Sequence, residues 1–152
     1  MIKKTSKLLF FIIICQTAGI IGSIFTYPSL QNWYPYITKP FFTPPSFIFA
    51  PVWIILFLLM GISIYLVWEN KKINLNWFWL QLGLNIMWSI IFFGLKSPAL
   101  GFIVILLLWF AIFKTIKEFG KYNKLASYLL YPYLIWVSFA GILNFSIMLL
   151  NF

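Results

Sequence analysis

The sequence contains no histidine and no arginine, and it has only one cysteine and two acidic residues among 152. Without histidine, the commonest metal ligand and proton carrier near neutral pH is absent, and no metal site is expected. Cys15 lies in an apolar run, so a disulfide within the chain is excluded and a small buried hydrophobe is expected. Because every basic residue is lysine, bidentate reading of phosphate or guanine is impossible, and no nucleic acid is expected as a partner.

The sequence is instead rich in apolar and aromatic residues: 63% of the residues are hydrophobic, 22% are aromatic and only 9% are charged. Soluble domains are usually about a quarter charged. A chain of this size could not bury so much apolar surface in water. We therefore predict a membrane protein, formed as one domain over residues 1–152.

Five apolar segments are each close to the roughly 20 residues that a membrane-spanning helix needs. They cover about 8–26, 46–68, 75–95, 98–115 and 125–150. The predicted fold class is an all-α membrane protein, a five-transmembrane-helix bundle.

Prolines set several expected boundaries. The residue before a proline is pushed out of the α region, so Pro28 predicts the end of the first helix and a loop over 27–44. Ser97 and Pro98 are typical of a helix N-cap and first turn. Pro132 predicts a kink near the start of the fifth helix.

Lysines are unevenly distributed between the two ends of such a bundle. With five crossings, one end carries Lys3, Lys4, Lys7, Lys71, Lys72, Lys114, Lys117, Lys121 and Lys124, and the other carries Lys39 and Lys96. This asymmetry predicts a bacterial inner membrane with the N-terminus inside and the C-terminus outside. The clusters also indicate contact with anionic lipid headgroups, so membrane lipid is an expected partner. Glu118 follows Lys114 by four residues, which predicts an ion pair on one helix face.

The stretch from Lys39 to Trp68, KPFFTPPSFIFAPVWIILFLLMGISIYLVW, joins a proline-rich loop to an apolar helix and contains no histidine. Four stretches, two of which overlap it, carry a resemblance. They are Trp33 with Lys39-Pro40, Phe42 and Pro44-Pro45; FAPVWIILFLLMG at 49–61; QLGLNIMWSIIFFG at 81–94; and LLYPYLIWVSFAGILN at 129–144. In combination they resemble the TspO/MBR family, which includes bacterial tryptophan-rich sensory proteins and the mitochondrial translocator protein. The resemblance covers about residues 31–151.

The resemblance implies a five-helix bundle with a pocket beneath the loop between the first two helices. It implies porphyrins as ligands, with sterols in the mitochondrial members, and it implies a homodimer. The expected ligand-binding residues are Trp33, Tyr34, Lys39, Pro45, Trp53, Asn85, Trp88, Phe92, Trp136 and Ala140. Small residues at 18, 19, 22 and 23 give the first helix a close-packing face, within one bundle or in a dimer.

The residues themselves leave alternatives open. Asn85 and Trp88 are three apart and therefore share a helix face, but Asn85 suits either ligand contact or a hydrogen bond between helices. Trp53 and Trp136 offer π-faces to a flat ligand, or they pack helices. Lys39 could pair with a propionate, remain a solvated cation, or hold the loop by bonding a helix-end carbonyl.

Three functions fit this pattern. The first is a membrane sensor that binds porphyrin, metal-free because no axial haem ligand is evident, with no other cofactor expected. The second is a light- and oxygen-dependent porphyrin-degrading enzyme, in which Trp53 and Trp136 would be the catalytic residues. The third is a passive transporter of porphyrin or another lipophilic molecule. The C-terminal GILNFSIMLLNF lacks the tyrosine and cation of the sterol-associated pattern, which argues against sterol binding.

Overall fold

The computed structural model describes residues 2–152, and this part of the chain contains helices and no strand. The helices are α1 (Ile2–Asn32), α2 (Phe49–Val67), α3 (Asn76–Ser89), α4 (Pro98–Gly120), α5 (Lys124–Tyr128) and α6 (Tyr131–Leu150). Short 3-10 helices occupy Tyr34–Tyr36 and Ser46–Ile48, and a π-helical turn, Ile90–Gly94, continues α3. Within the described residues five helical stretches are long and apolar enough to cross a membrane, with α5 and α6 forming the fifth. The predicted all-α bundle is confirmed, and the chain is an integral membrane protein.

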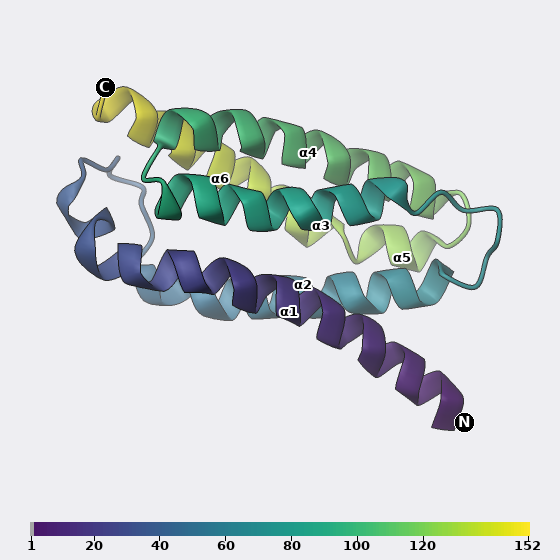
Figure 1. The fold of residues 1–152 in the computed structure, drawn as a ribbon. Coiled ribbons are helices and arrows are strands. Elements are labelled where there is room, and N and C mark those ends of the chain that lie inside the picture. The colour runs from purple at the N-terminus through teal and green to yellow at the C-terminus, as the bar shows by residue number, and fades with distance from the viewer. Residues whose placement is uncertain (1) are drawn as a thin grey trace.

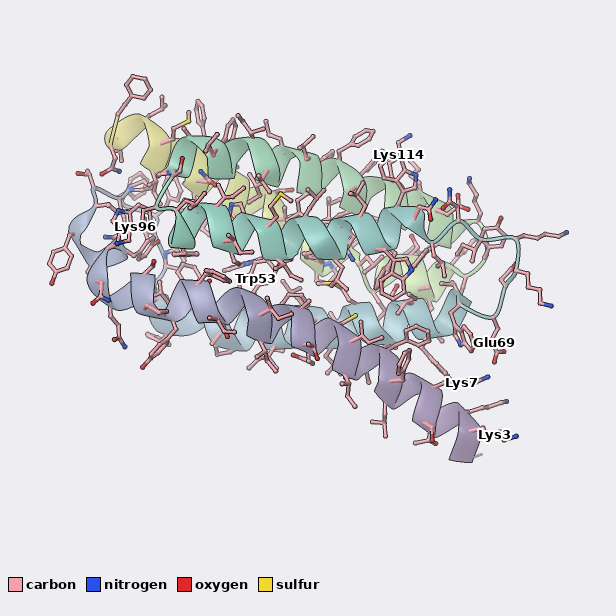
Figure 2. All side chains as sticks on the ribbon, viewed as in Figure 1. Lys3, Lys7, Trp53, Glu69, Lys96 and Lys114 are labelled. Atoms are coloured by element: carbon pink, nitrogen blue, oxygen red, sulfur yellow. The ribbon has the colours of Figure 1, made fainter. Side chains whose placement is uncertain are left out.

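The long helices run side by side, and the two chain termini lie at opposite ends of the bundle (Figure 1). Helix α1 packs on α2 and α3, and α4 packs on α3 and α6. Figure 2 shows Lys3, Lys7 and Lys114 at the end where the N-terminus lies, which we call the Lys-rich end, and Lys96 at the other end. Large side chains such as Ile24 project outward. In a bilayer this outer surface contacts lipid, so it needs no polar cover.

Glycines allow α1 to approach its neighbours closely. A Cβ on Gly61 of α2 would lie 2.6 Å from the Cα of Ile12, so the two helix backbones are nearly in contact there. Gly19 is covered by the ring of Phe57, and Gly22 faces α3. The small-residue face of α1 therefore packs within the bundle.

The prediction that the first helix ends before Pro28 is wrong, because α1 continues through Pro28 to Asn32. Proline removes one backbone donor from a helix but leaves the rest of the ladder available. Two bonds hold the next turn: Ser29 donates its hydroxyl to the Phe93 carbonyl, and Trp33 N donates to the Ser29 carbonyl. The connecting loop is accordingly shorter than expected.

Helix α4 also runs further than expected, to Gly120 instead of residue 115. Phe119 is fully buried and stacks on Phe78 of α3, with ring centroids 5.8 Å apart. This packing keeps the last turn helical although it carries Lys117, whose ammonium group can reach the membrane surface. The other two boundary predictions are confirmed: Ser97 accepts a hydrogen bond from Leu100 N as N-cap, and Pro132 follows the break between α5 and α6.

Candidate ligand pocket

An aromatic cavity of about 370 Å³ lies between α1, α2, α3 with its π-helical turn, and α6. Trp53, which lines the cavity, is labelled in Figure 2. The rings of Trp53 and Tyr133 meet edge to face at 6.2 Å, and those of Phe49 and Trp136 at 6.3 Å. Rings fixed in this way present both apolar faces and polar edges to a guest.

Two of the hydrogen bonds beside the cavity join side chains of α3 to side chains of α6. Asn85 Nδ2 donates to the Tyr133 hydroxyl at 2.7 Å, and Trp88 Nε1 donates to Asn144 Oδ1 at 3.0 Å. Asn144 in turn donates to the Pro98 carbonyl at 2.7 Å. Asn85 therefore bonds across helices and also lines the cavity, so its two expected roles are compatible. These bonds fix the α3–α6 wall before any ligand arrives.

Two polar groups of the cavity lining are left without partners. The Tyr34 hydroxyl and the Trp136 Nε1 are buried and have no hydrogen-bond partner among the described residues. Such groups are rare in proteins, because each costs about 1–3 kcal/mol. Burial raises the pKa of Tyr34 to about 12, so its phenol stays protonated and remains a donor at neutral pH. Both residues line the cavity, so its wall contains one O–H and one N–H donor that no described residue uses.

The lip of the cavity is a loop that is bonded to itself and to the C-terminus. Lys39 Nζ donates to the carbonyls of Tyr34 at 2.6 Å and Ile37 at 3.1 Å, and it lies over the Tyr34 ring. The structure therefore shows Lys39 in the loop-holding role and not as a solvated cation. Asn151, beyond α6, bonds both backbone groups of Thr38.

Most of the predicted residues come together at the cavity, and three do not. Those that line it are Tyr34, Trp53, Asn85, Trp88, Phe92, Trp136 and Ala140. Trp33, Lys39 and Pro45 lie outside the lining. Trp33 packs its ring edge-on against Phe92, and the Lys39 ammonium is occupied by loop carbonyls. Trp33 and Lys39 therefore stabilise the loop at the cavity without lining the cavity themselves.

The contribution of α1 to the lining was not anticipated. Gly19, Gly22, Ser23 and Thr26 form one wall, although the small residues among them were interpreted only as a packing face. The α6 wall continues from Trp136 through Phe139, Leu143, Asn144 and Ile147. That spacing is one helical stripe, which the sequence could have revealed.

The cavity reaches the lipid-facing surface between α1 and α2. Among the residues that line it, Ile20, Tyr27 and Ile54 are each more than half exposed. No lysine, carboxylate, cysteine or methionine lines it within the described residues. Acid–base chemistry by charged side chains is therefore not available there.

A bundle of five spanning helices around an uncharged cavity rich in aromatic rings defines an integral membrane protein with an internal cavity. The TspO/MBR family profile matches residues 11–150, and the chain belongs to that family. It is 46% identical over 149 residues to the tryptophan-rich protein TspO of Archaeoglobus fulgidus, covering 95% of this chain and 97% of the relative. It is 39% identical to protein CrtK of Rhodobacter capsulatus, and the match covers 93% of this chain and 90% of the relative. It is 34% identical to the human translocator protein, and the match covers 84% of this chain and 79% of the relative.

Proposed function

We propose that the cavity binds a flat tetrapyrrole, with metal-free porphyrin as its ligand, and that the protein is a sensor or regulator of tetrapyrrole or oxidative stress. The main support is the pair of unpartnered donors, the Tyr34 hydroxyl and the Trp136 Nε1, which belong to residues in the wall of an uncharged cavity rich in aromatic rings. A porphyrin combines broad π-faces with carboxylate acceptors, so it can satisfy both features.

The lining residues fit a metal-free ring better than haem. Axial ligands for haem iron are histidine, cysteine, methionine or tyrosinate. The first three are absent from the described lining. Tyr34 remains neutral because burial raises its pKa to about 12, so it is a poor iron ligand and a good hydrogen-bond donor.

The size of the cavity also bears on the proposal. About 370 Å³ lies at the lower end of the roughly 300–1,000 Å³ of small-molecule pockets. The opening between α1 and α2 lets the edge of a larger ring project toward the lipid.

Titration with protoporphyrin IX in the dark, read by tryptophan fluorescence quenching, tests the proposal. The double variant Trp53→Phe/Trp136→Phe removes ring area and one N–H donor, and we expect its affinity to fall roughly tenfold. Trp79→Phe/Trp109→Phe is the matched control, since neither residue lines the cavity. Equal affinity in both doubles would contradict the proposed site.

A light-dependent porphyrin-degrading activity is the second candidate, and it is favoured by the presence of both Trp53 and Trp136 on the lining. Illuminated porphyrin would take one electron from an indole ring, and the porphyrin radical anion would then add dioxygen through a new carbon–oxygen bond on the ring, while the indole is left oxidised by one electron. Under light and air, porphyrin should bleach more slowly with the Trp53→Phe/Trp136→Phe variant than with wild type. Equal bleaching rates would exclude this role for the two rings.

We also propose a bacterial inner membrane location with the Lys-rich end inside, on the strength of the lysine asymmetry. Reporter fusions at each terminus test the orientation: only an N-terminal fusion should report from the inside.

A homodimer is proposed as well, on a face other than the α1 glycines, which are used within the bundle. Crosslinking of the purified protein tests the dimer.

A further inference from the structure

Two lysines near the Lys-rich end of α4 lie over aromatic rings. Lys114 Nζ is 5.3 Å from the ring centroid of Phe110 and 6.0 Å from that of Trp77 on α3. Lys117 Nζ is 5.4 Å from the ring of Phe113. The Trp77 and Phe110 rings are themselves in edge contact at 5.7 Å. Figure 2 shows Lys114 at the same end of the bundle as Lys3 and Lys7.

Neither lysine has a carboxylate partner. The chain has two acidic residues, and both are engaged elsewhere. Glu118 pairs with Lys121 at 2.8 Å and accepts a bond from the backbone N of Asn74, so the predicted Lys114–Glu118 pair is wrong. Glu69 pairs with Lys7 at 3.4 Å. The two cations on α4 are therefore left uncompensated by the described residues.

We propose that Lys114 and Lys117 bind the phosphate of one anionic phospholipid in the leaflet at the Lys-rich end. Residues three apart lie on one helix face, so both ammonium groups can reach a single phosphate. The aromatic rings hold the lysine stems at the depth where headgroups meet hydrocarbon, as in an aromatic belt. Beyond them α4 exposes Leu106 and Leu107, against which the acyl chains can lie.

The charge balance favours a lipid anion as the occupant. Of the eleven lysines, nine belong to the Lys-rich end by sequence, and only two carboxylates exist to offset them. A headgroup near such a surface gains roughly fivefold in affinity for each lysine. Lys114 and Lys117 lie over aromatic rings. The loop lysines Lys71 and Lys72 have no such ring contact among the described residues.

The experiment compares two double variants of the full-length protein with the same loss of charge. Lys114→Gln/Lys117→Gln removes the proposed site, and Lys71→Gln/Lys72→Gln removes two loop cations at the same end. Each protein is titrated with phosphatidylglycerol or phosphatidylcholine in micelles, and bound lipid is counted by native mass spectrometry. We expect wild type to prefer phosphatidylglycerol, the first double to lose that affinity roughly tenfold, and the second to stay within about twofold of wild type.

Several outcomes would overturn the site. An equal loss in both doubles would show diffuse attraction to the whole surface, and no loss in either would exclude Lys114 and Lys117 as the binding site. Equal binding of the two lipids by wild type would exclude recognition of charge. The single variant Lys117→Gln, at an exposed side chain, keeps the test available if the double does not fold. Trp77→Leu/Phe113→Leu keeps every charge and should lose the preference for phosphatidylglycerol in part.

Discussion

Asn151 bonds both backbone groups of Thr38, a residue 113 positions away in the chain. Its Oδ1 accepts from Thr38 N at 2.9 Å, and its Nδ2 donates to the Thr38 carbonyl at 2.8 Å. The Asn151 side chain therefore pairs with the Thr38 backbone as a neighbouring strand would, and it holds the loop against the end of α6. We expect Asn151→Ala to release the loop, because two hydrogen bonds of about 1 kcal/mol each are lost.

Hydrogen exchange of the Thr38 amide measures this release. Exchange should become at least about tenfold faster in Asn151→Ala, and dissociation of bound porphyrin should become faster as well. Asn32→Ala is a control on an exposed asparagine at the other edge of the loop. An unchanged Thr38 amide in Asn151→Ala would show that other contacts hold the loop.

Tyr34 provides the sharpest test of the donors in the cavity. Tyr34→Phe removes one buried hydroxyl that has no partner within the described chain, and it leaves the ring contacts in place. We expect the free protein to be as stable as wild type or more so, and porphyrin affinity to fall about 3- to 10-fold. Tyr36→Phe is the matched control, because Tyr36 is 81% exposed on the same loop. Destabilised protein with unchanged affinity would assign the hydroxyl a structural role instead.

Gly61 should tolerate no side chain. In Gly61→Ala the new Cβ would lie 2.6 Å from the Ile12 backbone, so α1 must move away from α2. We expect a loss of about 1–3 kcal/mol in unfolding free energy, measured by denaturant titration in detergent. Gly83→Ala is the control, since nothing lies within 4 Å of a Cβ there and alanine favours helix. Equal stability of both variants would contradict the close α1–α2 contact.

Ligand binding should be independent of pH between about 7 and 9. Tyr34 is the buried titratable group on the lining, and burial raises its pKa to about 12. A raised pKa favours the protonated form in the folded state, so its contribution is complete below about pH 10 and is lost only as the pH approaches 12. Quenching titrations across this range should give one affinity. A steep one-proton change would indicate that another titrating group contacts the ligand.

Parts of the site followed from helical spacing alone. Asn85 and Trp88 share a face because they are three residues apart, and the structure places both on the cavity. The role of Lys39 was harder to predict, because its partners are carbonyls of its own loop, and their positions depend on the conformation of that loop. The prediction from Pro28 was wrong because local conformational preference takes no account of the bond from Ser29 to the Phe93 carbonyl, in the π-helical turn after α3, that stabilises the following turn.

The sequence by itself determined the environment: five long apolar segments and a strong lysine asymmetry require a membrane and an all-helical chain. Only the tertiary structure decided which polar groups are free. Trp88 and Trp136 look alike in sequence, yet one indole donates to Asn144 and the other has no partner among the described residues. The physical reason is that a hydrogen bond needs an acceptor within about 3 Å. The acceptor for Trp88 comes from another helix, 56 residues away, and only the packing of the bundle brings the two together.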